Sequence, residues 1–172
     1  MRWIQAACES TYIHSVEGNR LTIRDQLVLL AEIEGTPVGF CLSLIGRTKP
    51  DPLFVQLVAV VPWARRRGAG LSLLCATAAL EPQCNIALAT LDDNIAALAL
   101  NSRLAESMGA NITRVPLRRY RRSDLESARS ERHRPWVIEP PPRHCHRDLD
   151  RALPPAPERL ATVRRPPTTT QS

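Results

Sequence analysis

The chain has 172 residues, of which 44% are apolar and 4% aromatic, and a formal net charge of +6. This length fits one compact domain with an extension. We find no apolar run as long as a signal-peptide core or a membrane span, so the sequence does not predict a secreted or membrane-spanning protein. The five cysteines show no paired spacing, which predicts free thiols in a reducing, cytoplasmic environment.

Charge is unevenly distributed along the chain. Residues 1–113 carry 9 basic and 10 acidic side chains, whereas residues 114–172 carry 14 basic and 7 acidic ones. The segment 140–172 also holds 8 of the 15 prolines and few large apolar residues. Such a segment cannot bury enough surface to offset its ordering entropy. We therefore expect a folded domain over residues 1–139 and a disordered tail over residues 140–172 that is dispensable for folding.

The predicted elements begin after residues 1–20, for which the sequence gives no clear pattern. A turn at 34–37 joins the first two predicted strands into a hairpin, and the third strand is apolar except for Gln56, as in a strand buried on both faces. The expected strands cover residues 27–33, 38–45, 54–60, 86–90, 110–117 and 136–139. The expected helices cover residues 69–80 and 94–108, the second ending at Gly109. A charged loop or short helix is expected between the last two strands.

The most informative stretch lies between the third strand and the first predicted helix. The strand ends at Val60-Val61-Pro62, arginines follow at 65–67, and Gly68 and Gly70 precede the helix. A helix N-terminus presents unpaired N–H groups and partial positive charge, and glycine lets a bulky anion approach them. The pattern predicts a phosphate or pyrophosphate bound at the start of this helix.

Two common glycine motifs do not fit this turn. A dinucleotide-binding G-x-G-x-x-G needs glycine at position 73, which is Leu73, and a P-loop needs a lysine, whereas Lys49 is the chain's one lysine. The remaining pattern, Arg65-x-x-Gly68-x-Gly70 behind a Val-x-Pro strand end, resembles the acetyl-CoA pyrophosphate loop of the GNAT N-acetyltransferases.

The resemblance extends over residues 27–139 and implies an α/β fold of the α+β type. Its central sheet would be mixed and mostly antiparallel, flanked by helices, with an abbreviated N-terminal part. The family also implies that acetyl-CoA serves as co-substrate and that its pantetheine arm pairs with the strand before the glycine turn. A second family marker, an Asn that opens the next helix with Ala three residues on, is matched by Asn94 and Ala97. The cofactor-binding residues so implied are Val58, Ala59, Val60, Arg65, Arg66, Arg67, Gly68, Ala69, Gly70 and Asn94.

The catalytic positions of the family are only partly matched. Many members have Glu six residues before the proline, where this chain has Gln56, which can orient a group but cannot take a proton. Many carry Tyr seven residues after the helix-opening Asn, where this chain has Asn101. Tyr120 is an alternative acid. With no recognised base, turnover is expected to rise with pH toward the pKa of the acceptor amine, and His14, Asp92 and Asp93 are the first bases to test otherwise.

Two classes of function remain open from the sequence. The first is an acetyl-CoA-dependent N-acetyltransferase acting on a small amine or a protein amine, possible as a homodimer. The second is a basic nucleic-acid-associated protein or a GNAT-like enzyme that modifies a nucleobase, with contacts through residues 118–122. His133, His144, Cys145 and His146 have the chemistry of metal ligands. Metal binding is not expected, because His144, Cys145 and His146 are adjacent in the tail and give poor geometry for a closed site.

Overall fold

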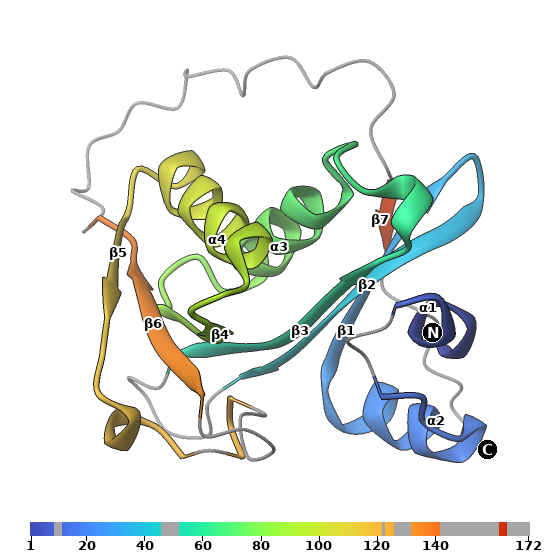
Figure 1. Ribbon diagram of the computed structural model, residues 1–172, viewed down its shortest axis with the longest axis horizontal. Helices are drawn as coiled ribbons and strands as arrows, with labels where there is room; N and C mark the ends of the chain where they lie inside the picture. The colour runs from blue at the N-terminus through green and yellow to red at the C-terminus, as the bar shows by residue number, and fades with distance from the viewer. Residues whose placement is uncertain (9–11, 46–51, 122, 126–131, 142–161, 165–172) are drawn as a thin grey trace.

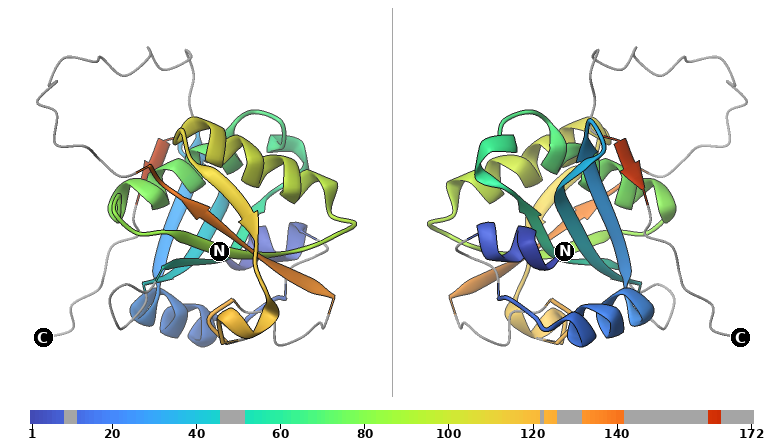
Figure 2. Two further views of the ribbon diagram at one scale, coloured as in Figure 1. Left: turned by 90° about the vertical axis from the view of Figure 1, so that its left-hand side faces the viewer. Right: turned by 90° about the vertical axis from the view of Figure 1, so that its right-hand side faces the viewer.

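The computed structural model describes residues 1–8, 12–45, 52–121, 123–125, 132–141 and 162–164. It contains a seven-stranded sheet in the order β5-β6-β4-β3-β2-β1-β7, in which β3 and β4 are parallel and the other neighbours antiparallel. The mixed, mostly antiparallel sheet expected from the sequence is therefore confirmed. Helices α3 and α4 cover one face of the sheet, and α1 and α2 lie against the other (Figures 1 and 2).

The elements between residues 27 and 114 agree closely with the sequence pattern, whereas β6 begins three residues before the predicted strand and β7 lies in the segment predicted to be disordered. The strands are β1 (Leu27–Ile33), β2 (Thr36–Ile45), β3 (Leu53–Val60), β4 (Ile86–Leu91), β5 (Asn111–Arg114), β6 (His133–Glu139) and β7 (Thr162–Arg164). The two predicted helices are α3 (Ala69–Leu80) and α4 (Ile95–Ser107). The strand expected over 110–117 is shorter, because a 3-10 turn over Leu117–Arg119 replaces its end. Glu34 and Gly35 both have positive φ, as a two-residue hairpin turn requires.

The first 25 residues form two helices that the sequence pattern did not predict. These are α1 (Arg2–Ala7) and α2 (Val16–Asp25). Ser15 caps α2 by accepting a hydrogen bond from the Gly18 N–H at 3.0 Å. Buried amides of Gln5 and Asn19 exchange hydrogen bonds of 3.1 and 3.2 Å, which joins the two helices. Helices α1 and α2 therefore contribute one helical layer on the face of the sheet opposite α3 and α4 (Figure 1).

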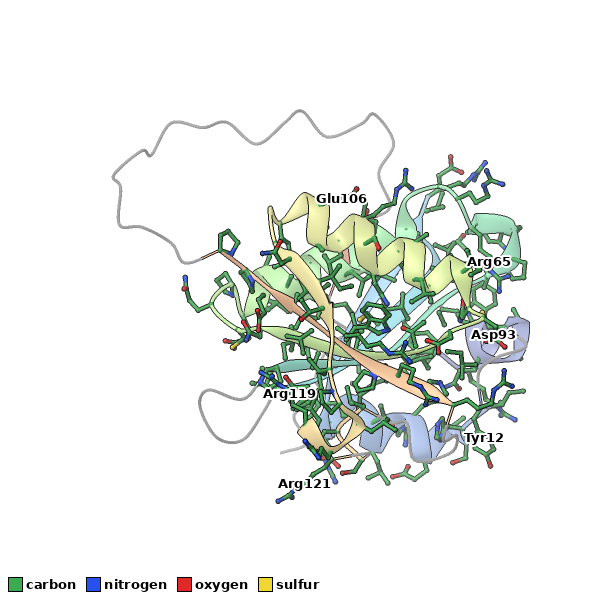
Figure 3. The ribbon with its side chains drawn as sticks, turned by 60° about the vertical axis from the view of Figure 1, so that its left-hand side comes forward. Tyr12, Arg65, Asp93, Glu106, Arg119 and Arg121 are labelled. Carbon is green, nitrogen blue, oxygen red and sulfur yellow. The ribbon has the colours of Figure 1, made fainter. Side chains whose placement is uncertain are left out.

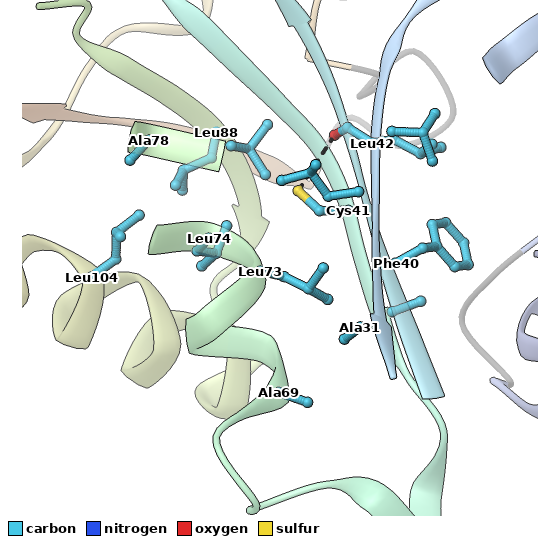
Figure 4. Close-up of a cluster of buried hydrophobic side chains, with 14 of the residues drawn as sticks. Ala31, Phe40, Cys41, Leu42, Ala69, Leu73, Leu74, Ala78, Leu88 and Leu104 are labelled. Carbon is cyan, nitrogen blue, oxygen red and sulfur yellow. Dashed lines mark hydrogen bonds between the residues drawn. The ribbon is translucent and has the colours of Figure 1, made fainter. Parts of the chain in front are cut away.

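The core lies between α3 and strands β1–β3, where Leu73 and Leu74 face the sheet (Figure 4). Phe40, fully buried on β2, points to the opposite face (Figure 4). Between them Cys41 is buried beside Ser43, and burial raises the pKa of its thiol. Gly39 is required on this strand, because a Cβ there would lie 2.7 Å from the carbonyl oxygen of Ala59. The four described cysteines are free thiols, as predicted.

The predicted tail is described only in part. Within it, Thr162–Arg164 pair as β7 with Leu30, Ala31 and Glu32 of β1, so these three residues are ordered against the sheet edge. The rest of the tail from residue 142, including the His144–His146 cluster, lies outside the described residues, and the domain boundary after Glu139 stays a prediction. No helix among the described residues is long and apolar enough to cross a membrane.

Candidate functional site: a cofactor pocket and an opposite face

The site is organised by a gap between two parallel strands. β3 and β4 pair only from Leu53 to Val55, opposite Ile86 to Leu88. The remainder of β3 pairs with β2 alone, so its other edge opens toward the start of α4. An unpaired strand edge inside a sheet presents backbone N–H and C=O groups that a ligand can satisfy.

The backbone groups at this edge belong to alternate residues of β3. The Val61 N–H donates to the Val38 carbonyl at 2.9 Å, and the antiparallel ladder alternates along the strand. Val58 and Val60 therefore direct their backbone groups toward the gap. The Val60 carbonyl accepts hydrogen bonds from Arg65 Nε at 3.0 Å and from Cys8 Sγ at 3.5 Å.

The turn after β3 presents the helix N-terminus as the sequence predicted. Gly68 is the N-cap residue of α3 with φ +85°, and no side chain caps the helix. Arg66 also has positive φ, at 61°. The first intrahelical bond runs from the Ser72 N–H to the Gly68 carbonyl at 2.9 Å. The preceding N–H groups of the first turn are therefore available to an anion.

A pocket of about 600 Å³ occupies the space between β3 and the first turns of α3 and α4. It is positively charged, because the ionisable side chains that line it include three arginines and no carboxylate. The lining residues are Cys8, Val58, Ala59, Val60, Ala64, Arg65, Arg66, Gly68, Gly70, Leu71, Asn94, Ala96, Ala97, Ala99, Leu100 and Arg103. Its strand edge suits an extended polar arm, and its helix N-terminus suits a pyrophosphate.

Eight of the ten cofactor residues predicted from the sequence line this pocket. Arg67 and Ala69 do not, and the Ala69 side chain is buried in the core. Asn94 lines the pocket and also caps α4, its Oδ1 accepting from the Ala97 N–H at 3.0 Å. Arg103 also lines the pocket and was not predicted; it lies three residues after Leu100 and seven after Ala96, the spacing that places these residues on one face of α4.

Gln56 lies where β3 leaves its regular pairing. Leu42 pairs with Leu57 and Ser43 with Val55, so Gln56 is the extra residue of a β-bulge. Its Nε2 donates to the carbonyl oxygens of Ser123 and Asp124 at 3.3 and 3.0 Å. Because two carbonyls can only accept, this contact fixes which end of the amide is nitrogen. Its Oε1 is buried and has no hydrogen-bond partner among the described residues.

The other two catalytic candidates lie in different places. Tyr120 packs edge-on against Phe54, with ring centroids 5.3 Å apart, and its hydroxyl accepts from Arg119 Nε at 3.2 Å. It belongs to the same loop that holds Gln56. Asn101 is buried and donates to Thr90 Oγ1 at 3.0 Å, which ties α4 to β4, and it does not line the pocket. The contacts of Asn101 are those of a scaffold residue.

The three fallback bases named from the sequence have other contacts. His14 stacks edge-on with the exposed Tyr12, the ring centroids being 5.0 Å apart. Asp92 pairs with Arg114 at 3.2 Å, and Asp93 pairs with Arg132 at 2.8 Å. Figure 3 shows Asp93 and Arg65 at one side of the molecule, and Arg119 and Arg121 well away from Arg65 on the lower loop.

The fold agrees with comparisons to known proteins. The model of the acetyltransferase (GNAT) family matches residues 1–105. The chain belongs to the GNAT family. The L-2,4-diaminobutyric acid acetyltransferase of Nocardia farcinica is 36% identical to this GNAT chain over 92 residues, which cover 52% of the chain and 48% of that protein. The chain thus matches about half the length of this curated relative.

Solved structures show the same fold. The diaminobutyrate acetyltransferase of Paenibacillus lautus, determined with L-2,4-diaminobutyric acid and coenzyme A, superposes with a TM-score of 0.53 at 25% identity, covering 66% of this GNAT chain and 70% of its own. The ribosomal-protein-S18-alanine N-acetyltransferase of Escherichia coli gives a TM-score of 0.55 at 19% identity, covering 87% and 90%. This second likeness concerns the fold alone.

Proposed function

We propose that this GNAT protein is an N-acetyltransferase that binds acetyl-CoA in the pocket beside β3 and transfers the acetyl group directly to a primary amine. The observation that carries the proposal is the unpaired β3 edge, which leads straight into an uncapped helix N-terminus flanked by arginines. An extended pantetheine arm and a pyrophosphate need these two features in this order. Membership of the GNAT family supports the same reading.

Each part of the pocket has a defined role in this proposal. The N–H groups at the start of α3, with Arg65 and Arg66, hold the pyrophosphate. The backbone groups of Val58 and the Val60 N–H face the gap and bind the pantetheine arm, while the Val60 carbonyl accepts from Arg65 and Cys8. Acetyl-CoA supplies an activated thioester when bound. Strand N–H groups near the bulge can polarise its carbonyl, and the protein gains rate by orienting the two reactants.

The acceptor amine approaches from the face that carries Gln56. The side chain is held by the loop carbonyls, so its Oε1 is set to accept an N–H from the amine. L-2,4-diaminobutyric acid is the first acceptor to test, because the 36%-identical relative is named for acetylating it. Nucleic-acid contact through residues 118–122, a homodimer and a cytoplasmic location stay predictions; Arg122 lies outside the described residues.

Calorimetric titration with acetyl-CoA tests the proposal. A Cβ at Gly68 meets no atom within 4 Å, but φ is +85°, so any substitution there carries backbone strain. Gly68→Ala provides the matched control, because it has the same strain with little added bulk. We expect the wild type and Gly68→Ala to bind, and Gly68→Glu to lose binding because a carboxylate then occupies the pyrophosphate site. Absence of binding to the wild type at millimolar acetyl-CoA would overturn the proposal.

A further inference from the structure

A histidine on β6 lies on the same face of the sheet as Gln56. Thr90 faces α4, since it accepts a hydrogen bond from Asn101, so the next residue of β4, Leu91, faces the opposite side. Leu91 pairs with His133 in the antiparallel ladder, and directly opposed residues point to the same face. His133 therefore lies on the face away from α3 and α4.

The Gln56 side of the sheet is identified in the same way. Ala87 also alternates with the α4-facing positions of β4, and it packs with Phe54, Leu125 and Tyr120. Tyr120 and Leu125 belong to the loop whose backbone carbonyls hold the Gln56 amide. The Gln56 amide and His133 thus share one face, on the two sides of β4.

Register places the two side chains near the open end of the gap. Val55 pairs with Leu88, so Gln56 is level with Ala89, two residues before the partner of His133. For paired strands, spacing and rise would separate these two backbones by about 12 Å, and the divergence of β3 from β4 beyond Val55 widens this span. The span leaves room for a small ligand between the two side chains.

Each side chain has one buried polar atom that no described residue satisfies. His133 Nδ1 is buried without a hydrogen-bond partner among the described residues, as is Gln56 Oε1. Buried polar atoms in native proteins are normally paired, so two such atoms on one face need an explanation. A ligand that carries several N–H donors satisfies both, and an ammonium group is such a ligand.

We infer that His133 is the base that takes the proton from the acceptor ammonium while Gln56 Oε1 orients it. This inference rests on the proposed acetyltransferase function. His133 takes one ammonium proton and passes it to solvent. The neutral nitrogen forms the new C–N bond as the C–S bond of the thioester breaks, and its second proton ends on the coenzyme A thiol.

Several charged groups surround the edge of the sheet that carries His133. The charged and titratable groups near this edge come from its own strand end, from the β4–α4 turn, from β5 and from the loop after β5. They are Arg132, Arg134, Asp92, Asp93, Arg114, Tyr120 and Asp124. Asp93 pairs with Arg132, and Asp92 with Arg114 and, at 4.0 Å, Arg134. Both carboxylates of the β4–α4 turn are thus paired with arginines, whereas the His133 Nδ1 has no hydrogen-bond partner among the described residues.

The test compares pH profiles of kcat/KM for L-2,4-diaminobutyric acid and a panel of other primary amines. Imidazole changes charge between about pH 5 and 8, and only its neutral form takes a proton. The wild-type rate should therefore fall as the pH drops through this range. In His133→Asn the amide can still hold the amine but cannot take a proton, so the profile should rise steadily toward the pKa of the amine. We expect a loss of about 100-fold at pH 7.

His14→Asn is measured alongside, because the sequence also offered His14 as a base; the inference predicts that the pH profile changes in His133→Asn and not in His14→Asn. Acetyl-CoA titrations should give the same affinity for all three proteins. If the wild type does not bind acetyl-CoA, the proposed function fails, and this result is distinct from a failure of the inference about His133. A second readout is NMR of the histidine rings in the coenzyme A complex, where adding diaminobutyric acid should shift the His133 signals. An unchanged pH profile in His133→Asn, or unshifted His133 signals in the wild type, would overturn the inference.

Discussion

The two faces of the sheet differ in how they are built. The face under α3 and α4 carries the cofactor pocket, and its strand, turn and helix are consecutive in the chain. The opposite face is assembled from α1, α2, β6 and the loop after β5, which are far apart in sequence. On the first face, functional groups are positioned by a strand, a turn and a helix N-terminus that follow one another in the chain. On the opposite face, their positions depend on the order of strands in the sheet and on long-range contacts.

The largest contrast we expect between the faces is in stability. Leu73 is fully buried between α3 and the sheet, whereas Leu125 belongs to a small cluster with Phe54 and Ala87. Leu73→Ala should lower the free energy of unfolding by about 2–5 kcal/mol. Leu125→Ala should cost less, because its cluster has fewer buried neighbours. Urea denaturation measures the free energy of unfolding of both variants. An equal or larger loss for Leu125→Ala would contradict the expected difference between the two faces.

The second expectation concerns the bulge residue. Gln56→Ala should lower kcat about 10-fold, as for one lost orienting hydrogen bond, without changing acetyl-CoA affinity. Gln56→Glu should not restore a base, because its second oxygen would face the carbonyl oxygens of Ser123 and Asp124. Steady-state kinetics on both variants decides this, and a rate gain in Gln56→Glu would show that the loop releases the side chain.

The third expectation separates scaffold from catalysis at Asn101. Thr90→Val leaves the buried Asn101 Nδ2 without its acceptor and should cost about 1–3 kcal/mol of unfolding free energy. At temperatures where the variant is folded, kcat should stay close to the wild-type value. A large fall in kcat with unchanged thermal stability would indicate that Asn101 acts in catalysis.

The smallest effect is expected at Asn94, which has two roles. Asn94→Ala removes the helix cap and should cost about 1 kcal/mol. Asn94→Asp keeps an acceptor for the Ala97 N–H and should retain stability, but it adds negative charge to the pocket and should weaken acetyl-CoA binding. Thermal melts and calorimetry on the pair distinguish the roles; equal cofactor affinity in both variants and the wild type would confine Asn94 to capping.

The sequence predicted the cofactor side closely because its signals are local. β1 has the bounds expected, and the glycine turn leads into α3 at the predicted residue. The opposite face could not be read in this way. Helices α1 and α2 are short, and they are joined by the buried Gln5–Asn19 amide pair, which no periodicity reveals.

His133 illustrates the same limit within the candidate site. In the sequence, His133 is one of four histidines, and arginines flank it on both sides. Its place on the Gln56 face depends on β6 inserting between β4 and β5, a topological fact that no local pattern encodes. Asn101 was assigned by its offset from Asn94, and no local pattern reveals its buried contact with Thr90; its catalytic role stays a prediction.

Amide NMR of the protein titrated with coenzyme A tests the central claim most directly. The account predicts that the shifts concentrate on Val58 and Val60 at the open β3 edge and on residues 68–71 at the start of α3. Shifts confined to the loop that carries Arg119 and Arg121, or absent from both the strand edge and the helix start, would contradict it.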